Sequence, residues 1–221
     1  MSIGSSVRAI LGPKLFKHAG HVYRSMFVDL RKVADTASEF LPPNAHVLDI
    51  GGGDGAPLNY LLHLRPDIRV TMIDTSPVIG GALHKGLLSR ITMLPATGVQ
   101  AYDQKYSSKL DAILICDVVH HITPVERVKF FEDVWLLLRK NNGARLIIKD
   151  VEPEGLCGLF VYLSDRYISG DKTVSLIHKR DLISLLKVAP EEISITETQL
   201  YSRNSPNYSI VIAFLGGGAS L

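Results

Sequence analysis

The sequence has few cysteines, no long apolar run and no large excess of charge of either sign. Two cysteines, Cys116 and Cys157, are too few for a disulfide framework or a four-thiolate zinc site. No run approaches the roughly 20 apolar residues that a membrane-spanning helix needs, and the N-terminus lacks a signal-peptide pattern. The 24 basic and 22 acidic residues nearly cancel, which disfavours a nucleic-acid or membrane partner. We therefore expect a cytoplasmic protein with a small-molecule partner.

Short apolar runs alternate with amphipathic stretches along the chain, a pattern typical of an α/β fold with a doubly wound sheet. Apolar residues recur at helical spacing, with proline near the start, in three segments: Leu58–Leu64, Pro77–Leu88 and Pro124–Leu138. Five apolar runs suit parallel strands that are buried on both faces: His46–Ile50, Arg69–Ile73, Ile91–Leu94, Asp111–Cys116 and Arg145–Lys149.

The C-terminal part differs from this alternation. Two strand-like runs, Ile193–Leu200 and Tyr208–Leu215, are separated by Tyr201–Asn207, which is rich in turn-forming residues. This pattern predicts an antiparallel hairpin at one edge of the sheet, which brings the expected number of strands to seven.

The N-terminal 44 residues are expected to form a helical cap before the first strand. They either cover the active site or only shield one face of the core. The remainder is predicted to be a single domain over residues 45–215, and the glycine-rich residues 216–221 a flexible tail. The expected cap carries one apolar stripe and a proline stop: Val22, Met26, Leu30 and Val33, then Leu41-Pro42-Pro43.

A glycine-rich loop follows the first predicted strand and leads into a helix. Glycines at Gly51, Gly53 and Gly55 let a ligand lie against bare backbone, although a simple tight turn is the alternative. Asp74 ends the next strand, 23 residues beyond Gly51. Its carboxylate is suited to accept both ribose hydroxyls of a nucleoside cofactor, or else to cap a helix before Pro77.

These residues resemble the class I S-adenosylmethionine (SAM)-dependent methyltransferases. That family's motif is an acidic residue, one residue, then Gly-x-Gly-x-Gly, and Asp49-Ile50-Gly51-Gly52-Gly53-Asp54-Gly55 matches it throughout. The resemblance extends over roughly Ala45 to Asp150 and implies a Rossmann-like fold with SAM as cofactor. It implies that the cofactor contacts come from Asp49, Gly51, Gly52, Gly53, Gly55, Asp74, Thr75, Thr97, Cys116 and Asp117.

The segment after the third predicted strand departs from the family pattern. Many members carry Gly-Asp there, with an acidic side chain near the adenine amino group, whereas this chain has Leu94-Pro95-Ala96-Thr97-Gly98. We expect Thr97 to substitute for that acidic residue.

Two other functions are compatible with the loop. Gly51, Gly53 and Ala56 also satisfy the Gly-x-Gly-x-x-Ala pattern of an NAD(P)-dependent Rossmann oxidoreductase. Asp49 and Asp54 place two carboxylates where a pyrophosphate would bind, and this favours the cationic groups of SAM instead. The third candidate is a non-catalytic SAM-binding protein.

A histidine pair, His120 and His121, follows the fourth predicted strand, near the methionine end of SAM in the family. Either imidazole is a candidate general base, and the alternative is that both only orient the loop. His121 is favoured because it lies farther past the strand end. Asp117 with Asp150 is too small a set for a catechol-type metal site, so no metal is expected.

The methyl acceptor is expected to be a small aromatic or apolar molecule, with O-methylation favoured over N- or C-methylation. It should enter over the carboxyl edge of the sheet, between the N-terminal helices and an insert from Glu152 to Lys179. Any one pocket residue is alternatively part of the core, and a homodimer is compatible with the sequence. The predicted pocket residues are aromatic: Tyr23, Phe27, Phe160, Tyr162 and Tyr167.

Overall fold

A computed structural model describes most of the chain. Several predicted features lie outside the described residues: the cap up to residue 28, the tail from residue 216, Cys157, and the pocket residues Tyr23, Phe27, Phe160 and Tyr167. The described residues are 29–106, 108–154, 158–159, 162–163, 165–166, 171, 173–187, 193–202 and 205–215.

A seven-stranded sheet with the order β3-β2-β1-β4-β5-β7-β6 forms the centre of the molecule. Strands β1 to β5 are parallel, as predicted, whereas β7 pairs antiparallel with both β5 and β6. The strands are β1 His46–Ile50, β2 Arg69–Ile73, β3 Ile91–Leu94, β4 Ala112–Cys116, β5 Arg145–Val151, β6 Ile193–Ser202 and β7 Ser205–Leu215.

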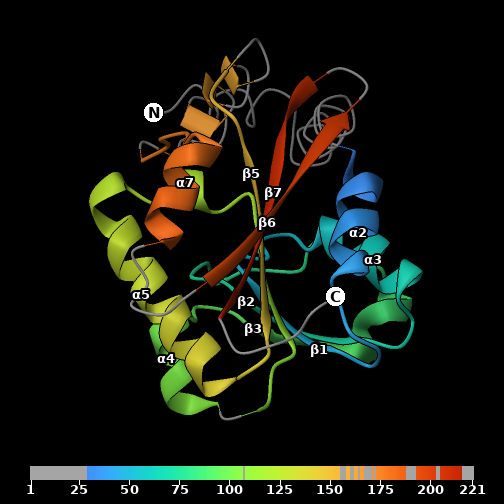
Figure 1. Cartoon of the computed structure of the whole chain (residues 1–221). Coiled ribbons are helices and arrows are strands. Elements are labelled where there is room, and N and C mark those ends of the chain that lie inside the picture. Colours follow the sequence, from blue (N-terminus) through green and yellow to red (C-terminus); the bar gives the residue numbers. More distant parts are fainter. Residues whose placement is uncertain are drawn as a thin grey trace.

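Helices cover both faces of the sheet, which gives three layers (Figure 1). Helices α2 (Leu30–Glu39) and α3 (Ala56–Leu64) lie on one side. Helices α4 (Val99–Lys105), α5 (Pro124–Lys140) and α7 (Lys179–Leu186) lie on the other. The α/β Rossmann-like fold with five parallel strands is therefore confirmed.

Two apolar clusters fill the space between the layers. One joins α2 and α3 to the sheet through residues such as Val33, Leu62 and Met72. The other joins α4, α5 and α7 to the opposite face, with Trp135 and Ile113 among its members. All five residues of β1 are buried, because a central parallel strand is covered on both faces.

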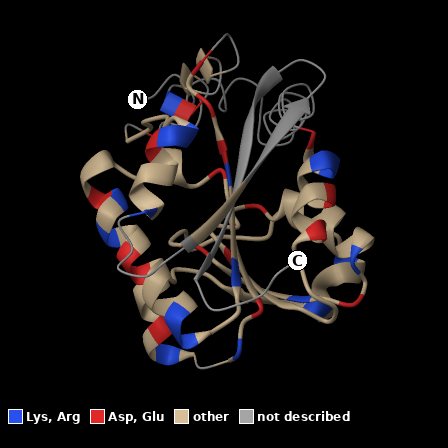
Figure 2. Cartoon of the chain, in the orientation of Figure 1, with Lys and Arg blue, Asp and Glu red and all other residues tan. Residues whose placement is uncertain are grey.

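Charged residues occur in the helices on both sides of the sheet. Basic and acidic side chains are interspersed along α5, α7 and α2 (Figure 2). Within the described part of the chain, no helix combines the length and the apolar character needed to cross a membrane.

The predicted helix over Pro77–Leu88 is wrong. The segment is an irregular loop that ends in a short 3-10 helix, η1 (Lys85–Arg90). Gly80 adopts a left-handed φ of 72°, which interrupts a helix. The buried Asn59 side chain donates to the carbonyl of Ala82 (2.8 Å) and accepts from the N–H of His84 (2.9 Å). These bonds fix the segment in a non-helical conformation. These contacts outweigh the apolar spacing on which the prediction rested.

Helix α2 is the described part of the predicted N-terminal helix. Asp29 caps it by accepting a hydrogen bond from the N–H of Lys32 at 3.2 Å. Val33, Ala34 and Ala37 form its buried face. The helix ends at Glu39, before the two prolines, as the sequence indicates. Helices α4 and α7, of seven and eight residues, were not predicted.

Strand order places several loops at one edge of the sheet. The order reverses between β1 and β4, since β2 lies on one side of β1 and β4 on the other. In open α/β sheets, ligands bind at the carboxyl ends of the strands at such a switch point. The loops after β1, β2 and β4 therefore frame the candidate site.

Candidate active site

The loop after β1 is held against the end of β2 by its own backbone. The N–H groups of Gly51 and Gly52 donate to the carbonyl of Ile73 at 2.8 and 3.3 Å. A Cβ at Gly51 would lie 2.6 Å from Cγ2 of Val118, so glycine is required where this loop meets the loop after β4. This contact brings the glycine loop next to the residues that precede the histidine pair.

Gly53 is the point at which the loop is open. It has a φ of 54°, and a Cβ built there would meet nothing closer than the Gly51 carbonyl oxygen at 3.9 Å. By contrast, a Cβ at Gly55 would lie 2.6 Å from the side chain of Leu83. A ligand can therefore lie directly against the backbone of Gly53, which is what a nucleoside cofactor requires of this loop.

Asp49 lies beneath the loop. Its side chain is almost inaccessible, with 3% exposure, and a Cβ at Gly52 would lie 2.3 Å from its Oδ2 atom. Burial, and then the negative charge of Asp74, raise the pKa of Asp49 to about 7. A cation placed close to this carboxyl would favour its ionised form.

Asp74 joins the glycine loop to the end of β2. Its Oδ2 accepts a hydrogen bond from the N–H of Gly53 (2.9 Å), and its Oδ1 accepts one from the N–H of Ser76 (2.8 Å). An ionised carboxylate has about four lone-pair positions, so both oxygens retain capacity for further donors. The alternative role as a helix cap is wrong, because no helix starts within the next ten residues.

Thr97 lies beside Asp74. Its N–H donates to the Asp74 carbonyl at 2.8 Å, and its hydroxyl donates to the carbonyl of Pro95 at 3.0 Å. The hydroxyl oxygen can still accept a hydrogen bond from a ligand. Thr75 is exposed at the same edge. The structure therefore brings Asp49, Asp74 and Thr97 to the glycine loop.

The end of β4 contributes Cys116 and Asp117. Burial, together with the adjacent negative charge of Asp117, raises the pKa of the Cys116 thiol, so this group stays neutral. Asp117 has a left-handed φ of 57°, and its N–H donates to the Lys149 carbonyl at 2.8 Å. Its carboxylate forms an ion pair with the Lys149 ammonium group, which is fully buried. Lys149 was not among the predicted site residues.

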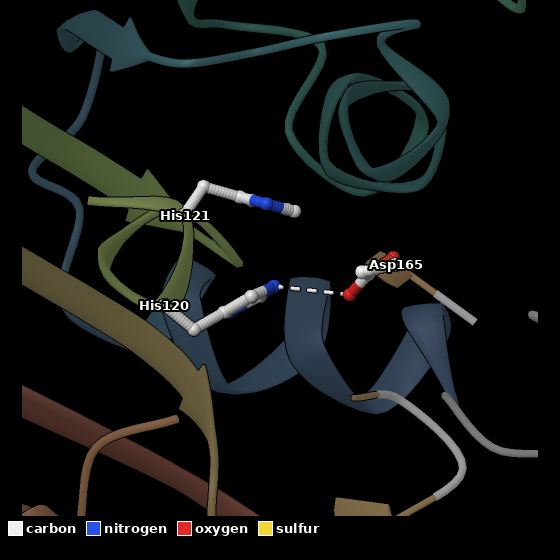
Figure 3. A group of neighbouring side chains, drawn as sticks. All are labelled: His120, His121 and Asp165. Atoms are coloured by element: carbon white, nitrogen blue, oxygen red, sulfur yellow. Dashed lines mark ion pairs between the residues drawn. The ribbon is translucent and has the colours of Figure 1, made fainter. Parts of the chain in front are cut away.

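His120 is a buried cation rather than a base. It belongs to the short 3-10 helix η2 (Val119–His121), and its side chain is only 3% exposed. Its Nδ1 lies 2.5 Å from Oδ1 of Asp150, and its Nε2 lies 3.4 Å from Oδ2 of Asp165 (Figure 3). Burial alone would lower the pKa of His120, but the charge and hydrogen bond of Asp150, aided by Asp165, raise it to about 10. At neutral pH this ring has no free nitrogen to accept a proton.

His121 is placed differently although it is the next residue. Its side chain is 39% exposed, and its Nδ1 lies 2.6 Å from Oδ2 of Asp171. The two histidine rings are 4.1 Å apart between centroids, and both leave the same short segment (Figure 3). Among the described residues, Nε2 of His121 has no hydrogen-bond partner. This nitrogen is therefore the one that can receive a proton.

The insert after β5 is tied to η2 by several bonds. The N–H of Ser175 donates to the His120 carbonyl at 2.8 Å. The buried Arg127 guanidinium donates to the carbonyls of Val119 (3.3 Å), Ile122 (3.1 Å) and Ser175. No pattern in the sequence pointed to Asp165, Asp171 or Arg127 as partners of η2. The two aspartates come from the distant insert, whereas Arg127 reaches back from the start of α5.

Two groups of side chains near the histidines have the composition of a metal site: His120, His121 and Asp165, and Asp117, His120 and Asp150. In each group the possible ligand atoms lie within 4.8 Å of one another. Their charges are already balanced within the protein, since Asp117 pairs with Lys149, and Asp150 pairs with His120. The absence of a metal stays a prediction.

Of the predicted pocket residues, Tyr162 alone is described. Its ring is half-buried and lies under the Arg166 guanidinium, at 5.7 Å from the ring centroid. A cavity of about 530 Å³ opens elsewhere, between α2, α3 and the loop before η1. Asn59, Tyr60 and His63 line part of it, and it contains none of the predicted site residues.

Comparison with known proteins agrees with this geometry. Residues 48–144 match the model of the methyltransferase domain family. No curated protein sequence matches the chain. The structure resembles the SAM-dependent methyltransferase SibL in its apo form, with a TM-score of 0.70 and 18% identity over 97% of this chain and 62% of SibL.

Two proteins from Burkholderia thailandensis are also similar. One is an O-methyltransferase family protein, with a TM-score of 0.66 and 16% identity over 86% of this chain and 57% of that one. The other is 1,6-didemethyltoxoflavin-N1-methyltransferase, solved with 1,6-didemethyltoxoflavin and S-adenosylhomocysteine. Its TM-score is 0.65, with 18% identity over 98% of this chain and 92% of that one. The chain therefore spans about three fifths of the first two proteins and nearly all of the third.

SAM is the cofactor of the matched family, and the open backbone at Gly53 fits a nucleoside cofactor. The family match covers the glycine loop, Asp74 and the histidine pair, and the fold is shared with solved members. Residues 48–144 thus carry a methyltransferase domain, and the chain shares its fold with solved S-adenosylmethionine-dependent methyltransferases.

Proposed function

We propose that this chain transfers a methyl group from SAM to a hydroxyl group of a small aromatic or apolar molecule. The observation that carries the proposal is the position of His121, an exposed imidazole that has one ring nitrogen bound to a carboxylate and lies three residues after Val118, which meets the glycine loop at Gly51. A hydroxyl must lose its proton as its oxygen is methylated, and a positioned imidazole accelerates such a step. A neutral amine attacks through its own lone pair, so it needs a base less.

The cofactor-binding role is assigned to the edge formed by β1, β2 and β4. When bound there, SAM supplies an electrophilic methyl group on a sulfonium centre. The backbone from Gly51 to Gly55 lets the cofactor approach closely, and the carboxylate of Asp74 accepts its ribose hydroxyls. The negative charge of Asp49 favours the cationic methionine end. Further contacts come from Gly52, Thr75, Thr97, Cys116 and Asp117.

The two histidines divide their roles in this proposal. His121 accepts the hydroxyl proton, and His120, held between Asp150 and Asp165, keeps η2 in place as a buried cation. Methyl transfer otherwise depends on positioning, because an in-line displacement needs the acceptor oxygen aligned with the methyl carbon. A rigid η2 segment serves that alignment.

The acceptor is assigned to the space over the carboxyl edge of the sheet. Tyr162 and the aromatic residues Tyr23, Phe27, Phe160 and Tyr167 are proposed as its walls. The N1-methyltransferase of similar fold was solved with bound 1,6-didemethyltoxoflavin, which supports a small-molecule acceptor. The O-methyltransferase family relative is consistent with a hydroxyl acceptor.

The domain organisation is part of the same proposal. Residues 45–215 act as one catalytic domain, whose sheet the antiparallel C-terminal hairpin completes, residues 1–44 cap the site, and residues 216–221 are a tail. The protein works in the cytoplasm, without a metal, nucleic acid or membrane.

The proposal is tested with methyl-labelled SAM and a panel of small phenols and heteroaromatic hydroxy compounds. Once an acceptor is found, His121→Ala should lower turnover about a hundredfold or more while affinity for SAM stays nearly constant. His63→Ala, an exposed histidine on α3, is the matched control and should retain full turnover. A His121→Ala enzyme of full rate would contradict the base, and labelling of amines alone would contradict O-methylation.

A further inference from the structure

We propose that Asp171 is a positioning residue that keeps the hydrogen of His121 on Nδ1 and so makes Nε2 the proton acceptor. This inference rests on the proposed function, because it concerns the base assigned there. Asp171 comes from the insert after β5, 50 residues from His121. Its role is to select the tautomer of the neutral His121 ring that carries its hydrogen on Nδ1.

The Asp171 carboxylate determines which ring nitrogen of His121 carries the hydrogen. Nδ1 of His121 and Oδ2 of Asp171 are 2.6 Å apart, which is short for a nitrogen–oxygen hydrogen bond and typical of a charge-assisted one. An ionised carboxylate can only accept, so Nδ1 must be the donor. In the neutral ring the other nitrogen, Nε2, then carries a free lone pair.

Asp171 is itself held as an anion. Burial alone would raise the pKa of Asp171, but hydrogen bonds from the hydroxyl and N–H of Thr173, and then from His121, lower it. The Thr173 N–H lies 2.7 Å from Oδ1, and the Thr173 hydroxyl lies 2.5 Å from the same atom. Asp171 therefore stays ionised, with Oδ2 directed at the imidazole.

Thr173 also links the Asp171 carboxylate to the backbone of His121. Its hydroxyl oxygen lies 2.9 Å from the His121 carbonyl oxygen, so its single hydrogen can be donated to either partner. The ring of His121 and its own main chain are thus both connected to residues 171–173.

The contrast with His120 supports a role specific to Asp171. His120 has a carboxylate near each nitrogen and is 3% exposed, so it is protonated at neutral pH. Among the described residues, His121 has one carboxylate at hydrogen-bond distance, Asp171 at Nδ1, and it is 39% exposed, whereas an Asp165 oxygen lies only within 4.8 Å of one of its ring nitrogens. His120 therefore cannot accept a proton at neutral pH, whereas His121 can accept one at Nε2.

In the reaction, the hydroxyl proton passes to Nε2 of His121 as the acceptor oxygen forms its bond to the methyl carbon. The bonding pair between that carbon and sulfur stays on sulfur. Asp171 takes no proton and stabilises the imidazolium that forms, as the aspartate of a serine-protease triad does. The proton is then released from Nε2 to water.

The test uses nitrogen-15 NMR of the full chain labelled at histidine, with S-adenosylhomocysteine as the bound probe. The His121 signals are assigned by their loss in His121→Gln. We expect Nδ1–H to be the main neutral tautomer in the wild type and Nε2–H to replace it in Asp171→Asn, whose amide group can donate to Nδ1. Asp181→Asn, an exposed change on α7, is the control and should leave the tautomer unchanged.

Kinetics with the acceptor found above give a second readout. Asp171→Asn should lower kcat by about tenfold or more with the KM for SAM unchanged, and should add almost nothing to the loss in His121→Ala. An Nε2–H tautomer in the wild type overturns the proposal without any variant. So does an Asp171→Asn loss that adds fully to that of His121→Ala. Failure of S-adenosylhomocysteine to bind would instead contradict the proposed function.

Discussion

Replacing Asp49 with asparagine is expected to stabilise the ligand-free protein above pH 7. The pKa of this buried carboxyl is raised from 3.8 to about 7 by burial and by Asp74. The folded chain therefore binds a proton between these values that the unfolded chain has lost. The free energy of unfolding contributed by this group decreases as the pH rises from about 4 to about 7 and then levels off.

The size of the effect follows from that shift. About three pKa units correspond to roughly 4 kcal/mol at alkaline pH, at 1.36 kcal/mol per unit. At pH 5 the same group costs only about 1.6 kcal/mol, so the stability gained by Asp49→Asn should increase by roughly 2–3 kcal/mol between pH 5 and pH 8. Urea unfolding at the two pH values measures this difference.

Asp35→Asn, an exposed change on α2, is the matched control and should give no such pH dependence. The same substitution at Asp49 should weaken binding of SAM about tenfold or more, because charged hydrogen-bond partners contribute about 1.5–3 kcal/mol. An equal stability difference at pH 5 and pH 8 would refute the reasoning about the buried carboxyl. Unchanged affinity would refute its role toward the cofactor.

Three further substitutions test the residues that form the cofactor site and the buried ion pair beside it. Asp74→Ala should reduce affinity for S-adenosylhomocysteine by about 2–3 kcal/mol in calorimetry, and unchanged affinity would reject ribose binding. Gly53→Val should abolish that binding without unfolding the chain, because the side chain would occupy the open face of the loop and disfavours a positive φ; Gly86→Ala, where a Cβ meets nothing, should bind normally. His120→Gln should cost about 3–5 kcal/mol of unfolding free energy near neutral pH by leaving Asp150 unpaired. Since the pKa of His120 is raised to about 10, its contribution is complete below about pH 6.5 and lost toward pH 10, and a constant loss in urea unfolding up to pH 10 would contradict the pairing.

The parallel strands could be predicted because each is buried on both faces and reads as an apolar run. All of β1, and all but the first residue of β2, are buried, for example. The helix predicted at Pro77–Leu88 failed because apolar spacing there says nothing of the Asn59 amide, which binds the loop from another helix. Long-range side-chain contacts outweighed a local pattern.

The residues of the candidate site also fall into two groups, those that could be predicted from the sequence and those that could not. Asp49, the glycines and Asp74 could be proposed because each lies next to a strand end that the sequence itself marks. Asp165, Asp171 and Thr173 could not, since they reach η2 from a distant insert with no periodic pattern. Nor could the sequence separate His120 from His121, because the distinction depends on which carboxylates surround each ring.

Binding of SAM at the β1–β2–β4 edge is tested most directly by calorimetry on the wild-type chain. SAM and S-adenosylhomocysteine should each bind with one site per chain, and NAD should give no heat of binding. Binding of NAD in place of SAM, or of neither nucleotide, would contradict the account.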